Sequence, residues 1–321
     1  MELKTEVQVL KSILAVNLDI NIWSARTKLN PEDFAHSELP PEKLVSLGSK
    51  KICDPEEIRI FGTLKARAVN LLDKSGIRFL GGWAVPELNA AKIIEELEII
   101  AHEFSLAKEN FLKRYDKAVQ SWIASNPGWE KVISSSIVRA DYVAKRIGFC
   151  WQVFKVASPT GRKKNVLEPG LQNEVEKLGS TLFGEIAKAA NEAWLKSYLG
   201  KTQITRKALS PLKNIQQKLS DLSFIEPRVS PVASLIKTAL DKIPSKGSIH
   251  GTTLLMLQGL LTLLGNTDSL TKYAQEIIDG RTHESVLDCL VQVKEKKPKN
   301  ESKIESAPIP ETQKLNSFGL W

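Results

Sequence analysis

Positive charge is concentrated in one part of the chain, and this cluster is the clearest hint of a chemistry. The net charge is +8, and residues 155–220 hold 12 Lys and Arg against 5 Asp and Glu, a net of +7 (12 − 5). Clustered cations can bind phosphate groups by displacing their counterions, without reading a base sequence. A solvated loop and helix face would explain the same charge. The candidate phosphate contacts are Arg162, Lys163, Lys164, Arg206 and Lys207, beside Lys155, Lys213 and Lys218.

No recognisable catalytic or metal-binding pattern accompanies this charge. His102-Glu103 lacks a second histidine four positions on, where Leu106 stands, and a helical zinc motif needs both. Neither a phosphate-binding glycine loop nor a Gly-x-Ser-x-Gly elbow occurs. Three widely separated cysteines favour neither a disulfide framework nor a zinc site. We therefore expect a protein that is not an enzyme and that holds no metal or cofactor.

The end of the chain combines a polar tail with an apolar tip. After about Val293 the sequence is rich in Lys, Glu, Pro and Ser, which is typical of a disordered segment. The tip carries Phe318, Leu320 and Trp321, and such side chains gain little unless they are buried. We expect the tip to dock on a partner, or else to fold back on its own chain.

The first elements that must position these residues are extended. Residues 14–22 alternate between apolar and other side chains, which predicts a strand with one buried face. Asp54 and Pro55 are typical of a helix start, and the helix should continue to about Lys74. Residues 76–86, with Gly81 and Gly82, predict a hairpin. The front of the chain is thus α+β.

Helical spacing dominates from Pro86 onward. Apolar residues recur every three or four positions from Ile93 to Trp122, which predicts one helix from Pro86 to Ser125, roughly 60 Å long. A matching spacing over residues 133–154 predicts a second helix that returns along the first as an antiparallel hairpin. A third stripe from Leu171 to Ala193 completes a three-helix bundle.

Shorter helices are expected in the remainder, over residues 205–222, 231–243, 251–264 and 268–279. The fold class is therefore mainly α, with a small α+β part at the N-terminus. The predicted organisation is an α+β cap, a long-helix bundle, a C-terminal helical region and a disordered tail with an apolar tip, at residues 1–86, 87–200, 201–293 and 294–321.

Composition limits the location of the protein. Hydrophobic residues make up 42% of the chain and charged residues 26%, the balance of a globular protein. The longest apolar stretch, residues 252–264, is too short to cross a bilayer, which needs about 20 residues. The first ten residues lack the apolar core of a secretory signal. We therefore predict a cytoplasmic protein without a membrane span.

Two motifs together resemble a known domain family. They are Leu18-Asp19-Ile20-Asn21-Ile22-Trp23-Ser24-Ala25-Arg26 and Gly76-Ile77-Arg78-Phe79-Leu80-Gly81-Gly82-Trp83-Ala84-Val85-Pro86. The sequence resembles a bacterial family of unknown function carried on plasmids, integrative elements and phages. The resemblance implies genes nearby for AAA+ ATPases of the MoxR or cobalt-chelatase kind, and it assigns no catalytic residues. By themselves, both motifs suit structural roles in a strand and a turn.

Two functions follow from these observations as expectations. The first is a non-enzymatic interaction or adaptor protein of a mobile element, whose partner is a protein; the resemblance implies an AAA+ ATPase as the candidate. The second is a sequence-independent nucleic-acid-binding protein in plasmid or phage DNA metabolism. Self-association through an exposed helix face is also open.

Overall fold

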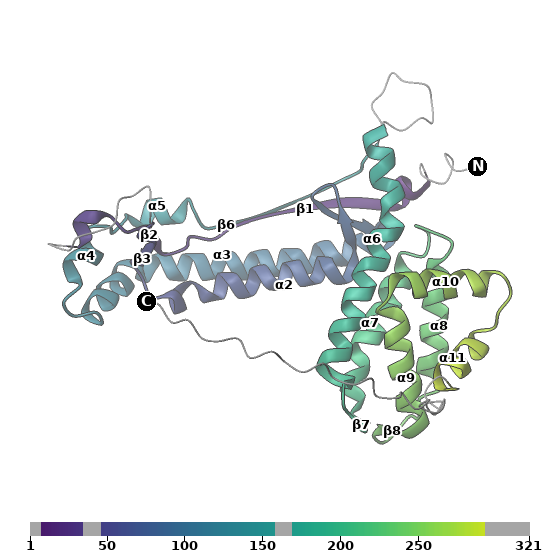
Figure 1. Cartoon of the computed structure of the whole chain (residues 1–321). Helices are drawn as coiled ribbons and strands as arrows, with labels where there is room; N and C mark the ends of the chain where they lie inside the picture. Colours follow the sequence, from purple (N-terminus) through teal and green to yellow (C-terminus); the bar gives the residue numbers. More distant parts are fainter. Residues whose placement is uncertain (1–7, 35–45, 158–168, 293–321) are drawn as a thin grey trace, which may run out of the picture.

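The computed structural model describes residues 8–34, 46–157 and 169–292, and it shows a long arm joined to a helical lobe (Figure 1). Helices make up most of the described residues, and the larger sheet lies in the N-terminal half. The predicted mainly α class with an α+β N-terminal part is therefore confirmed. The basic run at residues 162–164 and the predicted tail tip, Phe318, Leu320 and Trp321, lie outside the described residues.

A four-stranded antiparallel sheet joins the arm to the lobe. In spatial order its strands are β4 (Ile77–Phe79), β5 (Gly82–Pro86), β1 (Ile13–Asn21) and β6 (Gly148–Phe154). Along β1 the side chains of Val16 and Ile20 are buried, whereas Asn17, Asp19 and Asn21 are exposed. Successive side chains of a strand point to opposite faces, so the alternation predicted for this segment is confirmed.

The predicted hairpin at residues 76–86 is formed by β4 and β5. Leu80 and Gly81 at its turn have φ angles of 48° and 78°. Two positive φ values in a two-residue turn match the twist of the flanking strands. Gly82 then lies so close to β1 that a Cβ there would collide with the carbonyl oxygen of Val16. The glycine is needed for this close approach.

Two antiparallel helices, α2 (Arg59–Ser75) and α3 (Glu87–Ala124), form the body of the arm (Figure 1). The side chain of Asp54 accepts a hydrogen bond from the N–H of Glu56 and caps the 3-10 helix η2 (Pro55–Ile58), which leads into α2 as predicted. The predicted long helix is confirmed, because α3 spans 38 residues, about 57 Å. The helices bury a cluster of rings that includes Phe61, Phe104, Phe111 and Tyr115.

The prediction of a second helix that returns along α3 was wrong. The chain instead forms α4 (Glu130–Ser134), α5 (Ala140–Ala144) and then strand β6. Phe149, Trp151 and Val153 of β6 pack on the arm core, while Cys150 and Gln152 between them are exposed. The segment therefore follows a strand period and pairs with β1. The antiparallel helical hairpin exists, but its second member is α2.

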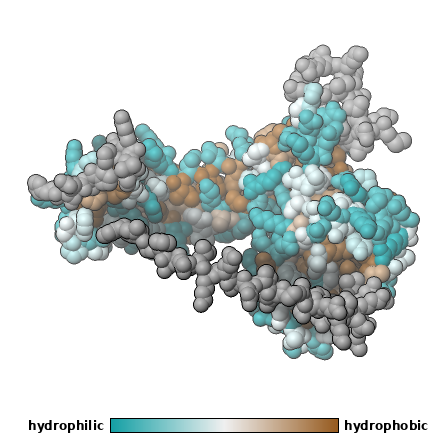
Figure 2. All heavy atoms as spheres, viewed as in Figure 1, coloured by the Kyte–Doolittle hydropathy of each residue, from teal (hydrophilic) through white to brown (hydrophobic). Residues whose placement is uncertain are grey.

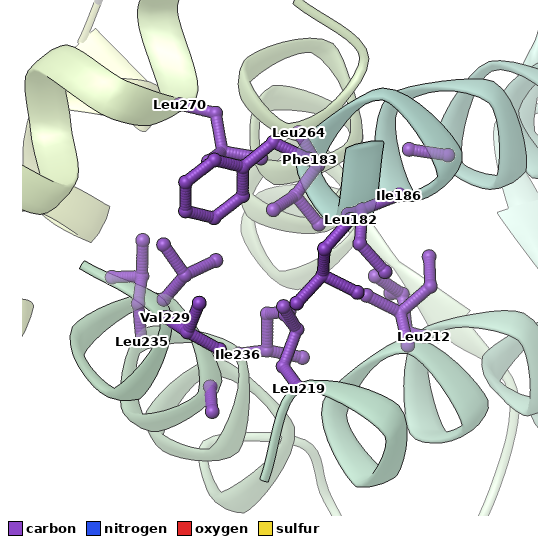
Figure 3. Packing of buried hydrophobic residues seen from close by; sticks show 14 of the residues in the cluster. Leu182, Phe183, Ile186, Leu212, Leu219, Val229, Leu235, Ile236, Leu264 and Leu270 are labelled. Carbon is purple, nitrogen blue, oxygen red and sulfur yellow. The ribbon is translucent and has the colours of Figure 1, made fainter. Parts of the chain in front are cut away.

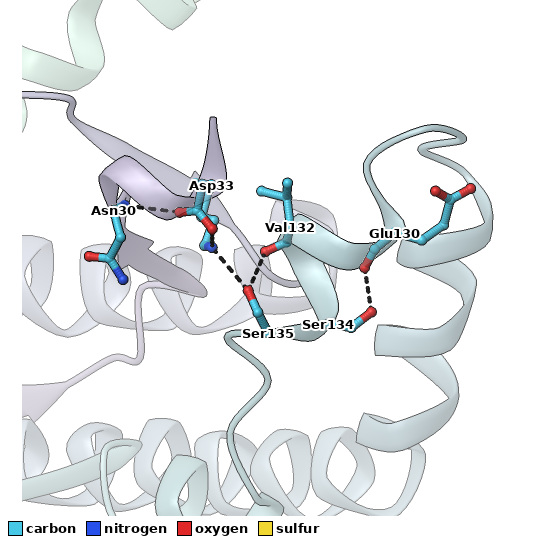
Figure 4. A network of polar contacts seen from close by, with 7 residues as sticks. Asn30, Asp33, Glu130, Val132, Ser134 and Ser135 are labelled. Atoms are coloured by element: carbon cyan, nitrogen blue, oxygen red, sulfur yellow. Dashed lines mark hydrogen bonds and ion pairs between the residues drawn. The ribbon is translucent and has the colours of Figure 1, made fainter. Parts of the chain in front are cut away.

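A buried ion pair holds the distal end of the arm together (Figure 4). Lys50 on β3 (Ser49–Lys51), which pairs with β2 (Arg26–Lys28), donates to the carboxylate of Asp33 in η1 (Pro31–Asp33) at 2.5 Å and to the hydroxyl of Ser135 at 3.4 Å. Desolvation by burial raises the pKa of Asp33. Hydrogen bonds from Lys50 and the Asn30 N–H outweigh it and lower that pKa below its ordinary value of 3.8.

The lobe is built from α6 (Pro169–Ala193) and from the five shorter helices that follow it, α7 to α11. α6 ends in a π-helical turn at Trp194–Tyr198. Its main contacts are with α9, β4 and α7 and not with α3. The prediction of a bundle of three long helices was therefore wrong. The lobe core is made of leucine, isoleucine and valine side chains around Phe183 (Figure 3). The remaining elements are β7 (Gln203–Ile204), η4 (Arg206–Leu209), α7 (Ser210–Asp221), α8 (Val229–Asp241), β8 (Ile249–His250), α9 (Gly251–Leu264), α10 (Thr267–Ile278) and α11 (His283–Gln292).

The sheet separates two hydrophobic clusters. Ile13, Ile77 and Phe79 belong to the lobe cluster, whereas Trp83 and Val85 belong to the arm cluster with α2 and α3. Figure 2 shows hydrophobic residues at the surface along the middle of the arm. Within the described ranges, every helix is too short or too polar to cross a membrane. The domain boundaries given above stay predictions.

Candidate binding cleft

A large cleft lies where the arm meets the lobe. Its volume is about 860 Å³, and it lies between the end of α2, strand β4, helix α6 and helix α7. These four elements come from distant parts of the sequence, and they meet because the sheet carries both the arm and α6. The cleft is therefore a product of the tertiary fold.

A buried lysine forms the base of the cleft. Lys218 of α7 is 8% exposed, and its ammonium group donates to the carboxylate of Glu185 on α6 at 2.7 Å. It also donates to the backbone carbonyl of Asp73 on α2 at 2.6 Å. A buried charge is tolerated only when it is paired and hydrogen-bonded. Lys218 therefore ties together the three helices that surround the cleft.

A second set of contacts links the base of the cleft to the arm core. The carboxylate of Asp73 pairs with the guanidinium of Arg78 at 2.9 Å and accepts a hydrogen bond from the indole N–H of Trp83 at 2.7 Å. The Arg78 guanidinium also lies 3.9 Å from the centre of the Trp83 ring, and its backbone N–H donates to Glu185 at 3.2 Å. The polar groups at the base thus hold one another in fixed positions.

One wall of the cleft is apolar. It is lined by side chains of α6 and α7 that belong to, or border, the lobe core, namely Ile186, Ala189, Ala193 and Ile215. Pro211 of α7 also lines it. Ala189 and Pro211 are partly exposed, so the wall is accessible from the cleft. An apolar wall beside a few fixed polar groups is typical of a binding site.

The rim of the cleft is basic. Lys74, Lys188 and Lys207 are exposed and, in the part of the chain that the structure describes, have no hydrogen-bond or ion-pair partner. Lys196 pairs with Glu192 one helical turn away at 3.2 Å. The lining residues include six basic and three acidic side chains, which gives a net charge of +3 (6 − 3). The cleft therefore favours an anionic ligand.

The basic residues predicted from the sequence occupy different places in the structure. Lys207 lines the cleft, whereas the Arg206 guanidinium donates to the carbonyl oxygen of Pro244 and holds two segments of the lobe together. Two further lysines of the predicted basic surface are engaged in the fold: Lys218 is buried, and Lys155 pairs with Glu87 at 2.8 Å. The interpretation of Lys218 as an exposed phosphate contact was wrong.

Sequence reasoning missed Lys74, Lys188 and the acidic groups of the cleft. One signal was available on α6, where Glu185, Lys188, Glu192 and Lys196 follow a spacing of three and four. These residues share one face of the helix, beside the apolar stripe. Lys74 gave no such signal, because only the tertiary fold brings the end of α2 to this site.

The described part of the cleft holds no arrangement that suits metal chemistry, since no group of three or more His, Cys, Asp or Glu among those residues could bind an ion. The acids at its base are engaged with Lys218, Arg78 and Trp83. The arrangement is thus suited to holding a ligand by charge and apolar contact.

Comparison with known proteins gives one family. A family model described as "Protein of unknown function (DUF3150)" matches residues 10–266, about four-fifths of the chain. The chain belongs to the DUF3150 family. The match includes all the residues that line the cleft of this DUF3150 protein. No curated protein and no solved structure matches it. The expectation of a domain of unknown function is therefore confirmed.

Proposed function

We propose that this protein is a non-enzymatic adaptor and that its cleft binds an acidic, amphipathic segment of a protein partner. The observation that carries the proposal is the combination of an apolar wall with three rim lysines, Lys74, Lys188 and Lys207, which have no partner among the described residues. Helices commonly bind grooves by placing apolar side chains on the wall and charged ones at the rim.

A peptide suits the cleft better than a phosphate backbone does. The apolar wall would gain nothing from phosphates, whereas leucine-like or aromatic side chains would bury surface there. A segment with both acidic and apolar residues satisfies both parts of the cleft.

The family resemblance suggests the class of partner. Proteins of this kind are expected beside AAA+ ATPases of the MoxR or cobalt-chelatase type on plasmids, integrative elements and phages. We therefore propose such an ATPase, encoded by the same mobile element, as the first partner to test. The arm and the lobe offer separate surfaces, so the protein could hold two components at once (Figure 1).

Photo-cross-linking in the native host tests the proposal. A benzoylphenylalanine at Ala189 would lie in the apolar wall, and one at Lys92 on the arm serves as the control position. We expect a protein adduct from Ala189 alone, with cross-linked peptides that are acidic and amphipathic. Peptides from an AAA+ ATPase would support the proposed partner.

Charge reversal of the rim lysines is the second part of the test. The triple variant K74E/K188E/K207E should lose the Ala189 adduct, and the matched variant K65E/K92E/K113E should keep it, because those three exposed lysines lie on the arm away from the cleft. A nuclease-sensitive adduct would instead favour the nucleic-acid alternative. An adduct of equal yield in both triple variants would overturn the assignment of the cleft.

A further inference from the structure

The distal end of the arm carries a second hollow that the adaptor proposal does not use. Its volume is about 380 Å³, and it lies where the chain leaves β1, enters β2 and passes the end of α5. This is the place of the sequence motif that ends in Trp23-Ser24-Ala25-Arg26. The elements around it, β2 and α5, lie at the opposite end of the arm from α6 and α7, which line the cleft (Figure 1).

Three cations line this pocket, and its described lining residues include no acidic side chain. Arg26 comes from the start of β2, and Lys145 and Arg146 follow α5. Within the described ranges, none of the three has an ion-pair or hydrogen-bond partner. Two acids close in sequence to the lining residues have other partners, since Asp19 accepts a hydrogen bond from Asn21 and Asp141 pairs with Arg139 at 3.7 Å. The described lining of the pocket therefore carries a charge of +3.

The walls that carry these cations are held rigidly. Trp23 packs against Phe111 and Tyr115 of α3, with ring centres 6.3 and 5.7 Å apart. The Tyr115 hydroxyl donates to the carbonyl oxygen of Val138 at 2.8 Å and so fixes the segment before α5. The Ile52 N–H donates to the carbonyl oxygen of Ala25 at 2.9 Å. Cations on fixed walls bind with less loss of conformational freedom.

The backbone at this site is strained. Ala25 is buried with φ of 55°, in the left-handed region that residues with a Cβ seldom adopt. The turn places Trp23 in the core and Arg26 on the surface within four residues. Strain of this kind is often found where a binding group must be held in a fixed direction.

An exposed aromatic ring completes the pocket. Tyr142 is 44% exposed, and the Arg146 guanidinium lies 4.4 Å from its ring centre. An exposed ring beside cations is the usual arrangement by which proteins bind single-stranded nucleic acid, since bases stack on the ring and phosphates meet the cations. A base paired within a duplex could not reach the ring in this way.

We propose that the distal pocket binds single-stranded nucleic acid, with one base on Tyr142 and the adjoining phosphates at Arg26, Lys145 and Arg146. The observations are the unpaired cations, the exposed ring and the fixed turn that hold them together. The site is separate from the cleft, so the protein could hold a nucleic acid at the arm and a protein partner at the cleft.

Fluorescence anisotropy with the full chain and a labelled 12-nucleotide oligothymidylate tests the proposal. We expect binding in 50 mM salt and a weakening at 200 mM with a slope of at least −2 in log affinity against log salt, since each phosphate contact on a single strand contributes about −0.7. The variant R26A/K145A/R146A should lose at least tenfold in affinity and about 2 in slope. The charge-matched variant K65A/K92A/K113A should lose much less.

The ring and the strand provide independent checks. Y142A should weaken binding by about tenfold, within the range known for one stacked base, while Y142F should bind like wild type. An unlabelled duplex of the same length should compete much less well than the single strand. Equal losses in the two triple variants, an unaffected Y142A, equal competition by duplex, or no binding at 50 mM salt in a protein with a normal circular dichroism spectrum would each overturn the proposal.

Discussion

Replacing Lys218 by methionine should destabilise the protein by about 3 kcal/mol. The change removes the charge that binds Glu185 and the Asp73 carbonyl, while keeping an apolar side chain of similar length. Breaking a fully buried pair costs about 3–5 kcal/mol because the remaining charge is left uncompensated. The side chain of Glu185 is 28% exposed, so water partly solvates it and the lower end of that range applies.

Urea unfolding followed by far-ultraviolet circular dichroism measures this effect. With a slope of about 3 kcal/mol per M, the midpoint should fall by about 1 M. The double variant K218M/E185L removes both charges and should be less destabilised than the sum of the single variants, by about 1–2 kcal/mol. A K218M midpoint equal to or above that of wild type would refute the reasoning, and additive single variants would show that the pair has no coupling.

Three further predictions concern the rest of the fold. The folded pKa of Asp33 is lowered, so its pair with Lys50 stabilises the protein above the ordinary pKa and is lost as pH falls through the lowered value. D33N should therefore be less stable than wild type at pH 6, and the difference between the two urea midpoints should shrink as the pH falls below the ordinary value of 3.8. G82A should destabilise the protein by about 2 kcal/mol or more, because its Cβ meets β1, whereas G184A in an open helical position should stabilise it by about 0.5–1 kcal/mol in thermal melts. Burial raises the pKa of Cys53 to about 11, and the charge of Glu57 adds to the effect. A thiol reagent at pH 8 should therefore label exposed Cys150 quickly and Cys53 only in urea. Rapid labelling of Cys53 in a Cys150→Ser variant would contradict this prediction.

Local patterns predicted the elements whose partners lie nearby. The helix start at Asp54, the turn at Leu80 and Gly81, and the long helix α3 all follow from signals within a few residues. The strand β6 was missed because its spacing fits both a helix and a strand. Its partner β1 lies about 130 residues away, with Leu18 opposite Trp151, and that pairing selects the strand.

The cleft could be predicted only in part for the same reason. Lys207 was selected from local charge, but charge in the sequence does not tell a rim lysine from Lys218, which the fold buries beside Glu185. The only sequence signal near the distal pocket was the motif that ends the first strand. The cations of the pocket come from segments about 120 residues apart, Arg26 and Lys145 with Arg146, and only the packing of Trp23 on α3 brings them together.

Four passes of the chain connect the lobe to the far end of the arm: β1 and α3 run outward, and α2 and β6 run back. Four antiparallel segments, joined by strand pairing and by a packed core of aromatic rings, should bend less than a single helix would. The arm should therefore act as a lever. With a length of about 57 Å, a rotation of about 5° at the lobe would displace the far end by about 5 Å, roughly one helical turn. A small rotation at the cleft would thus displace the distal pocket by about that distance.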